Sequence, residues 1–83
     1  PSYADTLGWI LVQRGQLETG LRHLREARLR NPENSEIRFH LAYALNKNGR
    51  KAEAKEELSA ALTGSGRVPN SDAVTQLKKE LGL

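Results

Sequence analysis

The sequence predicts an all-α fold made of antiparallel helix pairs, and three observations lead to that prediction. The chain repeats itself when residues 1–28 are placed over residues 35–62. Within each copy apolar residues recur at spacings of three and four, the period of a helix with one buried face. Each copy also has a glycine at the same place, where one helix would end and the next begin. The identical pairs are Leu7 and Leu41, Leu11 and Leu45, Gly15 and Gly49, Leu24 and Leu58, and Ala27 and Ala61.

The first copy predicts two helices that meet at Gly15. Ser2 can cap the first helix, and Asp5 lies in its first turn as an acidic variant of a capping box. The second helix is expected over about 17–30, because the Asn-Pro dipeptide that follows would end it.

Two glycines lie inside these predicted helices, at Gly8 and Gly20. Each costs a helix roughly 1 kcal/mol relative to alanine. A glycine also lacks a β-carbon, so it allows two helices to approach closely. We therefore expect these glycines to lie at a tight contact between the first two helices.

The second copy predicts a second helix pair. Asn34 or Ser35 caps a helix that ends near Asn48, Gly49 turns the chain, and another helix follows over about 51–62.

A fifth helix is expected after a loop over 63–70, which is rich in Gly, Ser, Pro and Asn. Asn70 or Ser71 can cap this helix, which runs to about Leu81. Its apolar stripe must be buried, and the free side of the second pair is the available surface, so we expect a capping helix. The stripe consists of Val74, Leu77 and Leu81.

The spacing of the small and large apolar residues resembles the tetratricopeptide repeat, a helix pair of about 34 residues. Ala4, Leu11 and Leu24 replace aromatic residues of that pattern, and the second copy has Arg38 and Gly66 where an aromatic residue and a proline are usual. The matching positions are Ala4, Leu7, Gly8, Leu11, Gly20, Leu24, Ala27 and Pro32 in the first copy, and Leu41, Ala42, Leu45, Gly49, Ala54, Leu58 and Ala61 in the second.

The resemblance implies two repeats, over 1–34 and 35–68, and a capping helix over 69–83, stacked as a short right-handed superhelix. We expect the chain to be part of a longer protein, because the repeat begins at its first residue, which is not Met. The stretch from Asp5 to Leu11 is similar to the last repeats of bacterial multi-repeat proteins, some of which accompany exosortase and exopolysaccharide systems. That narrower similarity implies the bacterial cytoplasm or the cell envelope, including the periplasm.

Composition restricts the partners of this chain. Its 83 residues are 37% hydrophobic and 28% charged, with a net charge of +3, which is far from the charge of a nucleic-acid-binding domain. The sequence has no cysteine, which excludes disulfides and thiolate metal sites. No apolar run approaches the ~20 residues of a membrane-spanning helix. We expect no membrane insertion, no cofactor and no small-molecule substrate.

The sequence predicts no catalytic residues and no metal site. The two histidines, His23 and His40, lie in different helices, and no motif surrounds either of them. The Gly64-Ser65-Gly66 tripeptide lacks the Lys-Ser/Thr pair of a phosphate-binding loop. We therefore expect a protein that is not an enzyme.

Arginines in the second predicted helix suggest RNA binding as one alternative. Glu18, Arg22, Glu26 and Arg30 nevertheless follow one another at i,i+4 spacing, which is typical of a solvated helix face. Phosphate tracking instead needs unpaired cations beside stacking aromatic rings.

The resemblance implies that the first helix of each pair lines a groove that binds a protein or peptide. Trp9 and Tyr43 occupy equivalent positions in the two copies and should face the same way. The groove positions are Asp5, Trp9, Val12 and Gln13 in the first copy, and Phe39, His40, Tyr43, Asn46 and Lys47 in the second.

Two alternatives to groove binding remain open. The rings could simply pack between helices, in which case the chain is the structural cap of a longer solenoid and has no ligand of its own. An apolar edge around Tyr3, Ile10 and Leu21 could also be exposed, and an exposed patch would favour a homodimer.

Overall fold

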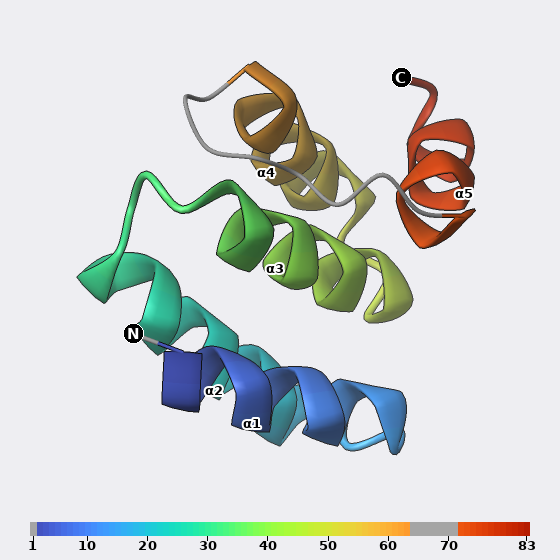
Figure 1. The fold of residues 1–83 in the computed structure, drawn as a ribbon. Coiled ribbons are helices and arrows are strands. Elements are labelled where there is room, and N and C mark those ends of the chain that lie inside the picture. The colour runs from blue at the N-terminus through green and yellow to red at the C-terminus, as the bar shows by residue number, and fades with distance from the viewer. Residues whose placement is uncertain (1, 64–71) are drawn as a thin grey trace.

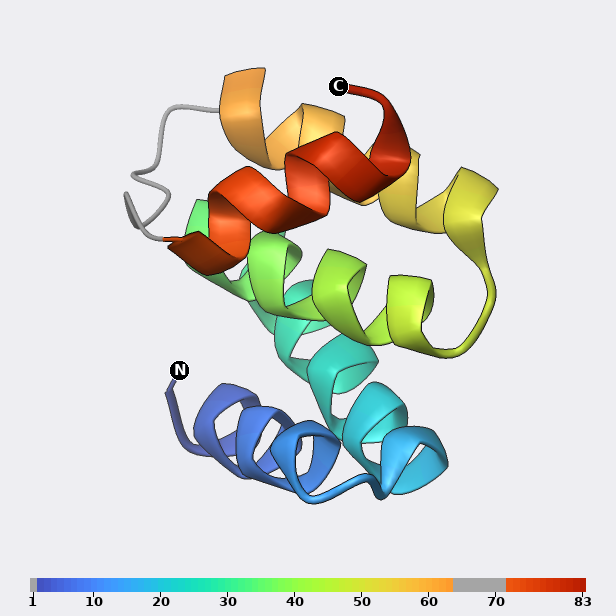
Figure 2. The ribbon, with the colours of Figure 1, turned by 90° about the vertical axis from the view of Figure 1, so that its right-hand side faces the viewer.

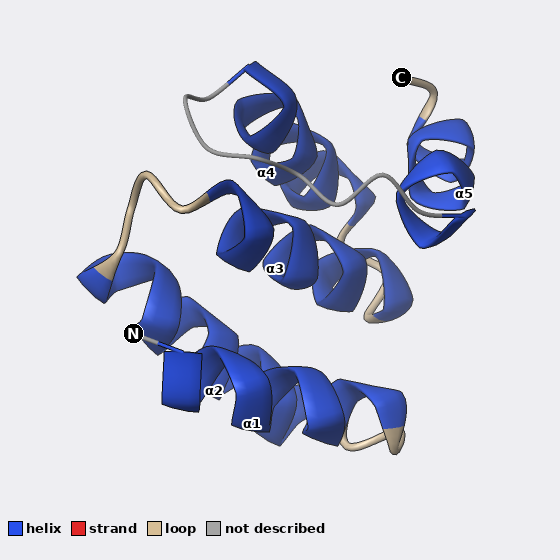
Figure 3. Cartoon of the chain, viewed as in Figure 1, coloured by secondary structure: helices blue, strands red, loops and turns tan. Residues whose placement is uncertain are grey.

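The computed structural model describes residues 2–63 and 72–83 and contains five α-helices in that part of the chain (Figure 1). The expected caps of the last helix, Asn70 and Ser71, and the Gly64-Ser65-Gly66 tripeptide lie outside the described residues. Short connections separate the first four helices (Figure 3). The helices are α1 (Ser2–Gln13), α2 (Leu17–Arg30), α3 (Ser35–Lys47), α4 (Lys51–Thr63) and α5 (Asp72–Leu81).

The two turns inside the helix pairs are built in the same way, as the repeat predicts. Gly15 and Gly49 have φ values of 84° and 80°, which a residue with a side chain rarely adopts. The next residue in each copy donates its backbone N–H to a carbonyl of the preceding helix. Gln16 donates to Leu11 and Arg50 donates to Leu45, both over 2.9 Å.

The helix α3 begins at an asparagine cap. The Asn34 side chain accepts a hydrogen bond of 3.0 Å from the backbone N–H of Ile37, so Asn34 rather than Ser35 provides the cap. Arg38 also donates to the carbonyl of Pro32 over 2.8 Å, which fastens the turn between the two pairs to α3.

The glycines of the first pair lie at a close crossing, which confirms the prediction. A β-carbon on Gly20 would lie 2.7 Å from Cγ2 of Val12 and 2.8 Å from the carbonyl oxygen of Gly8. A β-carbon on Gly8 would lie 2.8 Å from Cγ of Leu24. At both glycines the space holds a hydrogen atom but not a methyl group. The backbones of α1 and α2 are therefore in direct contact at this crossing.

The core is densest around α3, which contacts each of the other four helices. Leu41, Ala42, Ala44 and Leu45 are at most 1% exposed, so α3 is covered on more than one side. The stripe of α5 is also buried, which confirms that this helix covers the second pair. Its residues Val74, Leu77 and Leu81 join the same cluster.

Ion pairs join α2, α3 and α4 on the side away from α1. Glu57 of α4 accepts from Arg28 of α2 over 2.9 Å and from Arg38 of α3 over 3.2 Å. Arg25 of α2 donates to Glu53 of α4 over 2.8 Å, and this hydrogen bond lowers the pKa of the Glu53 carboxyl.

The structure tests two residues of the expected apolar edge, Ile10 and Leu21, and the side chain of Tyr3 lies outside its description. Ile10 is 45% exposed on α1, but Leu21 is only 5% exposed, because it packs into the core cluster. The prediction that Leu21 would be exposed was therefore wrong. No helix in the described residues is long and apolar enough to span a bilayer.

We predict that Gly20→Ala destabilises the chain by about 2 kcal/mol, because overpacking outweighs the gain in helix propensity. Urea unfolding followed by circular dichroism measures this change. Arg22→Ala, at an exposed position of the same helix, serves as the control and should change the stability by less than about 0.5 kcal/mol. Stabilisation by Gly20→Ala would contradict the close crossing.

Candidate functional site

The helices α1, α3 and α5 run side by side in the same direction and form one face of the molecule, seen in Figure 2. α1 and α3 are the first helices of the two pairs, and they carry all nine residues expected at a groove. α5 continues this row. The equivalent positions of neighbouring helices therefore lie next to one another across the face.

A buried polar pair joins the first two helices of this row. Nδ1 of His40 lies 2.7 Å from Oδ1 of Asp5, and the two side chains are 11% and 10% exposed. Asp5 comes from the first turn of α1 and His40 from the middle of α3. Because the pair is nearly closed to solvent, it fixes the distance between α1 and α3 at that point.

The rings of Trp9, His40 and Tyr43 form a cluster above this pair. The indole of Trp9 stacks on the imidazole of His40, with centroids 4.2 Å apart and planes 20° apart. Tyr43 meets Trp9 edge to face at 4.9 Å. Both Trp9 and Tyr43 are partly exposed, so the cluster presents ring surface to solvent while its other side rests on the core.

Besides Asp5 and His40, two more of the expected groove residues are buried instead of lining a surface. Val12 is 5% exposed and packs against the Gly8–Gly20 crossing. Phe39 is 3% exposed and tilts against Trp9 at 5.9 Å. Helical periodicity places both on the inner flank of the groove, where the neighbouring helix covers them. Val12 and Phe39 therefore belong to the core beneath the site.

A polar network continues the face from α3 to α5. Asn46 donates to Glu80 over 2.7 Å and accepts from Lys51 over 2.9 Å, while Gln76 donates to Glu80 over 3.0 Å. These hydrogen bonds, from Gln76 first and then from Asn46, lower the pKa of the Glu80 carboxyl. Nearby, Nζ of Lys47 lies 5.4 Å from the ring centre of Tyr43.

Sequence reasoning missed the contribution of α5 to this face. Gln76 and Glu80 are four residues apart and carry polar side chains on the edge that faces α3. Interpreting α5 only as a cap drew attention to its apolar stripe. Extending the groove pattern from α1 and α3 to the fifth helix could have identified them.

Gln13, the remaining groove residue expected on α1, is exposed at the end of that helix.

The Asp5–His40 pair contains two of the three parts of a nucleophilic triad. In the described part of the chain no hydroxyl group is hydrogen-bonded to the other ring nitrogen of His40, whose flat face is covered by Trp9. His23 lies half-buried on α2, which is not one of the helices of this row. Residues 2–63 and 72–83 hold no group of three or more His, Asp or Glu side chains placed for a metal ion.

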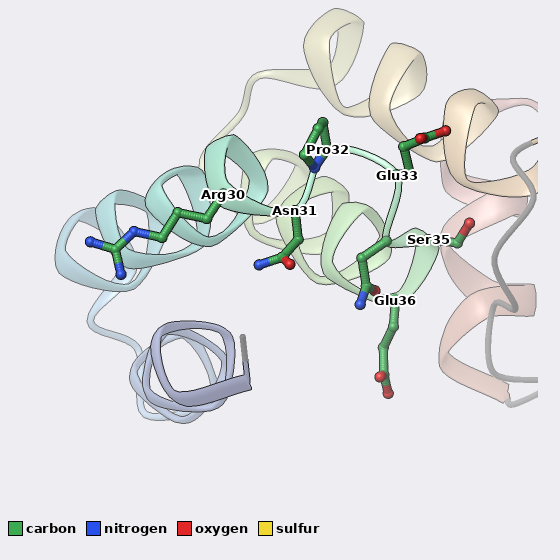
Figure 4. Close-up of a pocket in the computed structure, with 7 residues that line it drawn as sticks. Arg30, Asn31, Pro32, Glu33, Ser35 and Glu36 are labelled. Carbon is green, nitrogen blue, oxygen red and sulfur yellow. The ribbon is translucent and has the colours of Figure 1, made fainter.

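A wider hollow of about 600 Å³ lies at the turn between the two helix pairs (Figure 4). The end of α2, the turn and the first residues of α3 line it, and none of the expected groove residues does. Two of its polar groups already serve the local structure, since Asn34 caps α3 and the Pro32 carbonyl accepts from Arg38, whereas the buried hydroxyl of Ser35 has no hydrogen-bond partner among the described residues. We regard it as part of the connection between the pairs.

We predict that Asp5 and His40 are coupled in stability. A double-mutant cycle of Asp5→Ala and His40→Ala should give a favourable coupling free energy of about 1–3 kcal/mol, because either single change leaves a buried polar group without its partner. Urea unfolding of the four proteins gives this value. A control cycle that pairs Asp5→Ala with Lys79→Ala, at an exposed position of α5, should give no more than ~0.5 kcal/mol. Equal couplings in the two cycles would contradict the prediction.

Comparison with known proteins agrees with this architecture. A family model described as tetratricopeptide repeat matches residues 6–72, which covers most of the chain and both helix pairs. No curated protein sequence and no solved structure shows a significant match. The similarity to exosortase-associated bacterial proteins therefore stays a prediction. The matched model, the paired helices and the repeated turns together show that this chain belongs to the tetratricopeptide repeat family.

Proposed function

We propose that the face formed by α1, α3 and α5 binds a segment of a partner protein. Tetratricopeptide repeats are generally protein-interaction or scaffold modules, and the fold is typically non-catalytic. In this proposal the repeats occupy 1–34 and 35–68, and 69–83 forms the closing helix. The single observation that supports the choice of face is the partly exposed ring pair of Trp9 and Tyr43, 4.9 Å apart.

The ring pair has the features of an interface anchor. Large rings bury much apolar area and lose little side-chain entropy on binding, which is why Trp and Tyr are enriched at interface hot spots. Here the ring of Trp9 is already positioned by His40, and His40 is positioned by Asp5. A partner would therefore meet a surface that needs little rearrangement.

Polar groups around the rings can provide the hydrogen bonds that an interface needs beside its aromatic anchor. Gln13, Asn46 and Lys47 lie on the same helices as the rings, and Gln76 and Glu80 lie on α5. Amide side chains both donate and accept hydrogen bonds, so they suit the backbone of an extended segment. In this proposal Asp5 and Phe39 support the site and Val12 lies beneath it.

RNA binding is less well supported by the charge arrangement. Arg25, Arg28 and Arg38 are paired with Glu53 or Glu57, and Arg30 is paired with Glu26 over 2.9 Å. Cations that already have carboxylate partners are poor phosphate ligands, because each new contact would first break an ion pair. The paired arginines also lie away from the rings.

The proposal is tested by selecting short random peptides on the chain by phage display and measuring their affinities for variants. We expect Tyr43→Ala to weaken the selected peptides by about tenfold or more, the effect of losing a central aromatic anchor. Leu29→Ala is the matched control, because it removes an apolar side chain that is 76% exposed on α2. It should leave the affinities within about twofold.

Circular dichroism must show that both variants remain helical. Peptides that lose affinity equally in Tyr43→Ala and Leu29→Ala, or in neither, would argue against this face. Selection of no peptide at all would favour the alternative of a purely structural unit.

A further inference from the structure

We propose that the partner segment is acidic and inserts one apolar side chain into a small pocket between α3 and α5. This inference rests on the proposed function and specifies the chemistry of the segment. The pocket lies beside Tyr43 at the α5 end of the face and has a volume of about 170 Å³.

The size of the pocket matches one side chain. A cavity of roughly 150 Å³ accommodates a benzene molecule, so this volume admits a side chain such as that of leucine or phenylalanine but not a folded element. An inserted side chain therefore has to come from a segment that lies across the mouth, which favours an extended peptide over a bulky surface.

The lining of the pocket divides into an apolar floor and a polar rim. The floor is formed by Tyr43 of α3 and by Ala73 and Leu77 of α5. Leu77 is 3% exposed and belongs to the core, whereas Tyr43 and Ala73 are partly exposed. An apolar side chain on this floor would bury surface that is now wet, and this burial is the main source of affinity available there.

The rim is polar, and its carboxylate is already engaged. Glu80 accepts hydrogen bonds from Asn46 and Gln76. These two amides hold the one carboxylate of the rim in place, and the positive charges of Lys47 and Lys51 lie close enough to act on its negative charge.

Two lysines lie at this end of the face, since Lys47 lines the pocket and Lys51 lies beside it, next to Asn46. Lys51 donates to the Asn46 side-chain oxygen, and Lys47 lies over the Tyr43 ring. In the described residues neither lysine is within ion-pair distance of a carboxylate. Two lysines against one carboxylate leave this end of the face positive, in a chain whose net charge is +3.

Charge and shape together indicate the occupant. A carboxylate beside the inserted side chain would meet Lys47, and a lysine or arginine there would be repelled. We infer a segment with one leucine-like residue flanked by aspartate or glutamate. The Trp9–Tyr43 rings would then contact the part of the segment that continues toward α1.

The test uses short peptides of the form Gly-Ser-Asp-X-Asp-Ser-Gly, with every amino acid at X, added to the uniformly 15N-labelled chain. We expect leucine and phenylalanine at X to bind about tenfold to a hundredfold more tightly than serine. The shifted amide signals should include those of Tyr43, Ala73 and Leu77. Replacing both flanking aspartates by lysine should abolish these shifts.

Two variants of the chain examine the pocket and the charge separately. Ala73→Leu fills the pocket and should weaken the leucine peptide by about tenfold or more. Ala52→Leu, at an exposed alanine of α4, should leave binding unchanged. Lys47→Gln should weaken the peptide by about two- to fivefold at low salt and less at high salt. This variant does not touch the core, so it decides the question even if Ala73→Leu perturbs α5.

The results separate this inference from the proposed function. Shifts that map to α3 and α5, prefer an apolar X and disappear in Ala73→Leu would support the pocket. Equal binding at every X, binding that survives both variants, or no binding at the highest soluble peptide concentration would overturn it. If phage-selected peptides still depended on Tyr43 but not on Ala73 or Lys47, the proposed function would stand and the pocket would not be the anchor.

Discussion

The fold of this chain depends on the contacts of α3, whose apolar residues are buried against all the other helices. This helix contacts all four others, and its residues Leu41, Ala42, Ala44 and Leu45 are almost without solvent exposure. Small residues admit neighbouring helices closely, and leucines fill the space between them. Since every other helix is positioned against α3, a change in its packing would alter the spacing of the whole row.

The helix α3 also connects the core to the functional face. His40 is a residue of α3 that reaches Asp5 on one side and stacks on Trp9 on the other. A buried polar pair of this kind contributes less to stability than its distance suggests, because desolvation offsets much of the attraction. Its effect here is geometric, since it fixes the orientation of a ring that solvent reaches.

The helices and turns could be predicted from the sequence because local rules determine them. Apolar spacing gave the five helices to within a few residues, and Gly15 and Gly49 are the residues that a left-handed turn requires. The close contact at Gly8 and Gly20 was also predictable, because glycine inside a helix otherwise costs stability. Apolar spacing and glycine position are local features, because each depends on residues within one or two helical turns.

The candidate site could be predicted only in part, because it depends on contacts between distant residues. Asp5 pairs with His40, and neither the helical period of the apolar residues nor any sequence motif connects these two positions. Burial of Val12, Phe39 and Leu21 depends on how closely the neighbouring helix packs against them. A helical wheel shows which face of a helix a residue lies on, but not the distance to the next helix. The contribution of Gln76 and Glu80 depends on where α5 docks, and more residues separate α5 from α4 than separate the earlier helices from one another.

The guanidinium of Arg38 has a consequence for the mechanics of the molecule. It bonds both the Pro32 carbonyl in the turn between the pairs and the Glu57 carboxylate of α4, and Glu57 also holds Arg28 of α2. The joint between the two repeats is thus braced across its outer side and cannot act as a free hinge. Changing the angle between the two helix pairs would therefore require these bonds to break, so that angle is set within the chain itself.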